Sequence, residues 1–92
     1  MWMTIAVLAS PDNGRPDSID VSIVVDILWA VVLPRDRIEH IHVRAGPGQI
    51  DVVVYHLTHD TASAVTTVVD LCLRAVQGSP WLRGWTVRGP YP

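Results

Sequence analysis

Two β-type segments separated by a Gly-Pro-Gly sequence form the pattern that most restricts how this chain can fold. Ile38–Arg44 alternates between apolar and polar residues, Ile50–Leu57 is rich in valine, and the two flank Gly46-Pro47-Gly48. Glycine and proline supply the backbone conformations that tight turns need, so the pattern predicts a β-hairpin. A turn at Pro47-Gly48 pairs Ala45 with Ile50, and this pair sets the register of the two strands.

The register sorts the hairpin side chains into two sets, because successive side chains of a strand point to opposite faces of the sheet. The nearly all-aliphatic set is expected to lie under helices and consists of Ala45 with Ile50, Val43 with Val52, Ile41 with Val54, and Glu39 with His56. The mixed set is expected to form an open face and consists of Arg44 with Asp51, His42 with Val53, and His40 with Tyr55.

Three of the chain's four histidines lie in this hairpin, which raises the question of a metal site. The alternation places His40 and His42 on the open face and His56 on the opposite face, which excludes a site made of all three. Zinc sites need at least three protein ligands. The sequence therefore predicts no metal bound with high affinity, and we expect no cofactor. His40 and His42 could chelate a metal only with a third ligand from another strand or subunit.

The segment before the hairpin predicts a strand followed by a helix. Residues 4–9 are apolar and end at a cluster of turn-forming residues, which is typical of a strand. Residues 18–33, with Ser18 as the cap, form a run of about fifteen residues that is too long for a usual strand. We expect a helix there, and Pro34 is expected to end it.

The segment after the hairpin predicts a second helix and a last strand. Asp60 or Thr61 can cap a helix that runs to Gln77, with Gly78 as the residue just past its end. Residues 85–88 are expected to form a short strand that closes the sheet.

These six elements belong to one domain. Ninety-two residues leave no room for a second core, so the domain spans residues 1–92, with a tail at 89–92. The order β-α-β-β-α-β predicts an α+β ferredoxin-like sandwich, in which a four-stranded antiparallel sheet carries two helices on one face.

The charge pattern argues against nucleic-acid binding and against lysine chemistry. The formal net charge is −2, the seven basic residues are all arginines, and they are scattered along the chain. Nucleic-acid binders carry a basic patch, and Schiff-base or Walker-type sites need a lysine. Arginine without lysine also fits GC-rich coding bias, which points to a bacterial source.

Three features predict a cytoplasmic protein with no membrane partner. The N-terminal residues lack the positive charge of a signal peptide. The longest apolar run, Ile19–Leu33, is shorter than the roughly 20 residues that span a bilayer, and Asp20, Ser22 and Asp26 interrupt it. Cys72 is the single cysteine, so the chain can form no internal disulfide, which suits a reducing compartment.

Two surfaces are more apolar than an isolated domain of this size needs. The first strand is expected to turn Met3, Ile5 and Val7 toward the helices, so its other residues lie on the open face: Trp2, Thr4, Ala6 and Leu8. The first helix is apolar nearly all round. Its expected outward stripe contains Ser22, Asp26 and Trp29, flanked by Val25 and Val32.

An apolar centre with a polar margin is the layout of an association surface. The predicted binding residues are Trp2, Trp29, His40, His42, Arg44 and Tyr55. We expect a small non-enzymatic interaction or regulatory module, an adaptor or accessory component. It forms a homodimer through the open sheet face, binds a protein partner, or does both. No catalytic residue is predicted.

Two alternatives stay open. An ACT-like sensor would bind a small ligand at a dimer seam and needs a Gly-rich turn between strand and helix, which Asp12-Asn13-Gly14 resembles only loosely. A small dimeric α/β-barrel enzyme would use His40 or Tyr55 as an acid or base. Against the enzyme, the open face offers few polar groups that converge.

Overall fold

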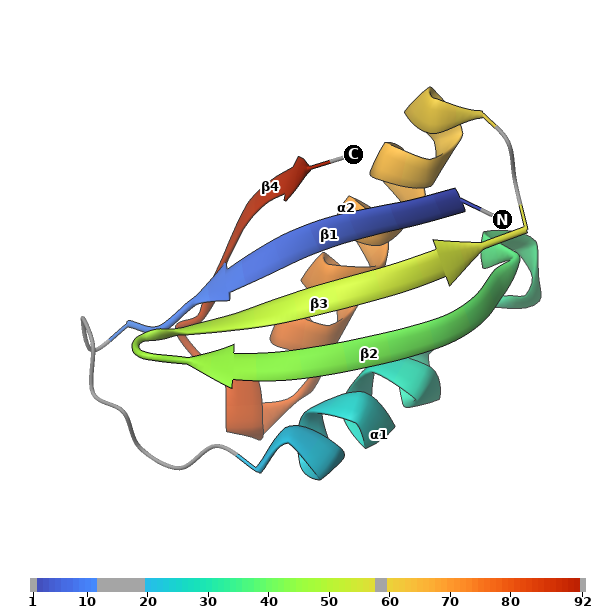
Figure 1. Ribbon diagram of the computed structural model, residues 1–92. Coiled ribbons are helices and arrows are strands. Elements are labelled where there is room, and N and C mark those ends of the chain that lie inside the picture. The colour runs from blue at the N-terminus through green and yellow to red at the C-terminus, as the bar shows by residue number, and fades with distance from the viewer. Residues whose placement is uncertain (1, 12–19, 58–59, 92) are drawn as a thin grey trace.

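A computed structural model describes residues 2–11, 20–57 and 60–91. In chain order the elements are β1 (Trp2–Ala9), α1 (Val21–Val31), the 3₁₀ helix η1 (Pro34–Asp36), β2 (Ile38–Gly46), β3 (Gln49–His56), α2 (Thr61–Gly78), the 3₁₀ helix η2 (Pro80–Leu82) and β4 (Thr86–Tyr91). The four strands form one antiparallel sheet in the order β2-β3-β1-β4, and α1 and α2 cover one of its faces (Figure 1). The α+β ferredoxin-like fold predicted from the sequence is confirmed.

The core lies between the sheet and the two helices. The strands contribute buried residues at alternate positions: Ala6, Leu8, Ile41, Val43, Ile50, Val52 and Val54. The helices contribute Val24 and Leu28 from α1 and Ala64, Val68, Leu71, Cys72 and Ala75 from α2. In α1 the two buried residues are four apart, and in α2 they recur every three or four residues, so each helix buries one stripe.

The hairpin register is the one expected from the turn, with one difference at its open end. Ala45 pairs with Ile50, and the pairing continues as expected through His40 and Tyr55. Beyond this point a β-bulge shifts the register, so Ile38 and not Glu39 lies opposite His56. The prediction for Glu39 is therefore wrong, because the bulge inserts an extra residue there and the side chain is exposed.

The face assignment of β1 is also wrong. Thr4, Ala6 and Leu8 are fully buried beneath the helices, whereas Met3 is exposed on the other face and Ile5 and Val7 are half-buried there. The pairing of β1 with β3 decides this orientation: Thr4 lies opposite Val54, and Ala6 opposite Val52. Both residue sets of this strand are mostly apolar, so alternation alone could not choose between them.

The predicted binding residue Trp2 pairs through its backbone with His56, and its side chain is outside the part of the chain that the structure describes. Met3 is the residue of β1 that lies opposite Tyr55.

The helix α1 is shorter than expected at both ends. Asp20 caps it by accepting a hydrogen bond from the backbone N–H of Ser22 at 2.9 Å, and the expected cap Ser18 lies outside the described residues. Val32 and Leu33 are extended, because the residue before a proline avoids the helical conformation and Pro34 begins η1.

The C-terminal part of the chain is more regular than expected. The strand β4 reaches Tyr91, so residues 89–91 belong to the sheet and not to a tail. A register shift where β4 passes Ile5 and Val7 places Gly89, with a φ of 72°, in the irregular part of the strand. The helix α2 includes Gly78, and Ser79 rather than Gly78 ends it.

Candidate functional site

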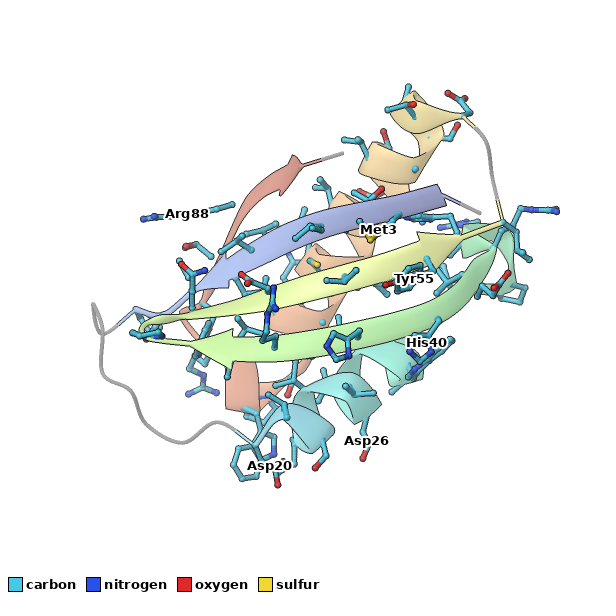
Figure 2. All side chains as sticks on the ribbon, viewed as in Figure 1. Met3, Asp20, Asp26, His40, Tyr55 and Arg88 are labelled. Carbon is cyan, nitrogen blue, oxygen red and sulfur yellow. The ribbon has the colours of Figure 1, made fainter. Side chains whose placement is uncertain are left out.

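The uncovered side of the sheet, called the open face below, presents residues from all four strands. Its described members include Met3, Ile5, Val7, His40, His42, Arg44, Asp51, Val53, Tyr55 and Arg88. Cross-strand pairing arranges them in three rows: His40–Tyr55–Met3, His42–Val53–Ile5, and Arg44–Asp51–Val7–Arg88. Figure 2 shows the first of these rows crossing β2, β3 and β1.

The centre of the open face is apolar. Met3, Ile5 and Val7 lie in line along β1, and Val53 and Tyr55 lie beside them on β3. Met3 exposes 44% of its surface, whereas Val53 is only 8% exposed although no helix covers this face. Val53 is flanked by Ile5 and His42 in the neighbouring strands, and these shield it. The two central strands thus carry a continuous apolar strip.

The β2 edge of the open face carries imidazoles. His40 and His42 are both exposed, at alternate positions of the strand. The His40 ring lies against the Tyr55 ring, with centroids 5.9 Å apart and planes tilted by 38°. This contact holds one face of the imidazole against the apolar strip and leaves the rest in water.

An arginine lies on each edge strand of the open face, β2 and β4. On β2, Arg44 Nε lies 3.9 Å from Asp51 Oδ2, and Gln49 Nε2 donates a hydrogen bond of 3.0 Å to Asp51 Oδ1. The Arg44 side chain is 73% exposed, so the pair contributes little stability. On β4, the exposed Arg88 lies in the same row as Arg44 (Figure 2). Both edge strands are therefore polar around the apolar strip.

The structure brings together four of the predicted binding residues: His40, His42, Arg44 and Tyr55. Trp29 is 40% exposed on the outer side of α1, with the exposed Ser22 and Asp26, and α1 covers the other side of the sheet (Figure 1). Sequence reasoning missed Met3, Ile5 and Val7. The pairing partners of β1 were the signal that would have identified them.

His56 is chemically separate from the open face. Its side chain is fully buried under the helices, and neither ring nitrogen has a hydrogen-bond partner among the described residues. Burial lowers the pKa of His56, because the charged imidazolium would lose its hydration. The predicted separation of His56 from His40 and His42 is confirmed. Within the described residues, no three His, Cys, Asp or Glu side chains gather closely enough to hold a metal ion.

A second polar region lies between η1 and α2, around a shallow cavity of about 430 Å³. Asp36 is 7% exposed and accepts two hydrogen bonds, from the Leu33 backbone N–H at 2.8 Å and from Arg74 Nη2 at 2.9 Å. The Asp36–Arg74 pair ties η1 to α2, which gives it a structural role.

The thiol of Cys72 lies in the core. It is fully buried on α2, and burial raises its pKa to about 12.

In the parts of the chain that the structure describes, neither helix is long and apolar enough to cross a membrane.

Comparison of this chain with protein-family models, with curated proteins and with solved structures finds no match in any of the three.

Proposed function

We propose that the chain is a small non-enzymatic interaction module whose open face binds a second copy of the same chain. The observation that carries this proposal is the layout of the open face, an apolar strip on the two central strands between polar residues on both edge strands. Protein interfaces have this anatomy, with an apolar centre and a polar rim.

The area of the open face supports a homodimer. The four strands contain 8, 9, 8 and 6 residues in chain order. With a spacing of about 4.8 Å between strands and a rise of about 3.3 Å per residue, they cover roughly 500 Å². Two such faces would bury roughly 1,000 Å² together, which reaches the lower limit of specific interfaces. A two-fold dimer of this kind uses the same patch on both copies, and we expect an affinity in the micromolar range.

The chemistry of the open face supports a binding role over an enzymatic one. Asp51, its central carboxylate, is already engaged by Arg44 and Gln49, and the His40 ring lies against Tyr55. A general acid or base needs a partner that positions it and room for a substrate beside it.

The proposed setting is the bacterial cytoplasm, supported by the single cysteine and by seven basic residues that are all arginine.

The proposal is tested by placing a charge in the middle of the proposed dimer interface. Tyr55→Asp puts a carboxylate beside the apolar strip, and burying it in a dimer costs several kcal/mol. Trp29→Asp is the matched control, because it adds the same charge in place of an exposed aromatic residue on α1. Sedimentation velocity over roughly 1–100 μM reports the mass, and circular dichroism reports the fold.

We expect the wild type and Trp29→Asp to form dimers of twice 10.1 kDa and Tyr55→Asp to stay a folded monomer. A wild type that is monomeric at every concentration would refute the proposal. A folded Tyr55→Asp dimer together with a monomeric Trp29→Asp would move the interface to α1.

A further inference from the structure

His40 and His42 place two titratable groups on the rim of the open face. We infer that they make the association sensitive to pH, so that mild acid separates the two copies. This inference rests on the proposed homodimer and adds a means of regulating it.

The position of the two imidazoles carries the argument. Both lie on the edge strand β2, in the two rows whose centres are Tyr55 and Val53. In the single chain both side chains are exposed. A second sheet laid over the apolar strip would take water from them, and a charged imidazolium loses more on leaving water than a neutral imidazole does.

The charged groups around these imidazoles disfavour protonation in the dimer. Arg44 lies two residues along β2 from His42, and Arg88 lies at the far margin of the next row. Met3, Ile5 and Val7 on β1 carry no charge. Each of these groups occurs twice in a two-fold dimer, so added protons bring like charges together.

Two carboxylates could offset this repulsion. Asp51 is already engaged by Arg44 Nε at 3.9 Å and by Gln49 Nε2 at 3.0 Å. Glu39 lies at the β2 bulge, outside the cross-strand rows of the open face. Among the residues that the structure describes on the open face, protonated imidazoles therefore meet no carboxylate other than Asp51, which is already engaged.

The sign of the pH dependence follows from linkage. Imidazoles ordinarily take up a proton as the pH falls through about 6.5. If the dimer binds fewer protons than two free chains, its dissociation constant rises as the pH falls. Exclusion of one proton per dimer changes that constant tenfold per pH unit, so we expect at least a tenfold increase between about pH 7.5 and 5.5.

The experiment measures the dimer dissociation constant at both pH values by sedimentation, with circular dichroism at each. The wild type is compared with the double variant His40→Gln, His42→Gln, in which both side chains stay polar but no longer titrate. We expect the ratio of the two constants to be at least ten in the wild type. In the double variant the ratio should fall to less than threefold, whatever its affinity at neutral pH.

Three results would overturn the inference, and a fourth would refute the proposed function on which it rests. A folded wild type with equal dissociation constants at both pH values would show that association does not depend on pH, and it would not contradict the proposed homodimer. An undiminished ratio in the double variant assigns the effect to other groups. A wild type that loses its circular dichroism signal at the lower pH shows acid unfolding, to which the buried His56 contributes, and not dissociation of folded chains. A wild type that is monomeric at neutral pH refutes the proposed function itself.

Discussion

Replacing Arg74 by methionine is expected to lower the free energy of unfolding by about 2–3 kcal/mol. Arg74 Nη2 lies 2.9 Å from Asp36 Oδ2, and the side chains of Arg74 and Asp36 are 28% and 6% exposed. Methionine keeps most of the aliphatic packing of arginine and removes the guanidinium. Asp36 is then left as a nearly buried carboxylate without its cation.

The size of this loss in the free energy of unfolding depends on the interactions that Asp36 keeps after the substitution. Removing one partner of a fully buried ion pair costs about 3–5 kcal/mol. Here the cost is smaller, because Asp36 still accepts the Leu33 backbone N–H at 2.8 Å and because Arg74 is partly in water. The loss is still large beside a total stability of about 5–15 kcal/mol for a domain.

Urea unfolding followed by circular dichroism measures the effect. Arg35→Met is the matched control, since Arg35 lines the same cavity, is exposed, and should change stability by less than about 0.5 kcal/mol. The double variant Asp36→Leu, Arg74→Met should cost less than the sum of its two single changes. Exact additivity, or equal losses in Arg74→Met and Arg35→Met, would refute the reasoning about this pair.

Three further outcomes are expected. Burial lowers the pKa of His56 below the ordinary value of about 6.5, so the folded state binds fewer protons than the unfolded state. The free energy of unfolding should therefore fall by up to about 1.4 kcal/mol per pH unit as the pH drops below about 6.5. Thermal melts should show a weaker dependence of stability on pH in His56→Leu than in the wild type. Cys72, with its pKa raised to about 12, should resist iodoacetamide at pH 8 until urea unfolds the chain, as mass spectrometry would show. Gly84→Ala should lower the free energy of unfolding by about 1–3 kcal/mol, since φ is 83° at Gly84 and the new Cβ would lie 3.2 Å from Pro11 Cγ. Gly78→Ala is the control, because Gly78 has open space around it, and this change should be neutral or stabilising.

The hairpin was predictable because its two faces differ in chemistry. Valine and isoleucine occupy one set of positions and imidazoles and an ion pair the other, so a slip by one residue would bury charge. The bulge at Glu39 was not predictable, since one extra residue at the end of a strand leaves no local signature. The early end of α1 was visible in principle, because Pro34 restricts the residue before it.

The centre of the open face could not be read from β1 alone. Ile5 and Val7 are bulkier than Ala6 and Thr4, and bulk favours the core, yet the structure turns the larger pair outward. The helix α2 packs on β1, and the small, fully buried side chains of Thr4 and Ala6 allow close packing there. Only the long-range pairing of β1 with β3 separates the two possibilities.

The position of β1 also bears on how the chain folds during its synthesis. This strand precedes both of its sheet partners in the chain but lies between them, beside β3 (Gln49–His56) and β4 (Thr86–Tyr91). Its first partner, β3, is the second strand of the hairpin, and its other partner, β4, follows α2 and η2. During synthesis, β1 therefore stays unpaired at both edges while the local hairpin forms, and the sheet is completed only after β4 has been made.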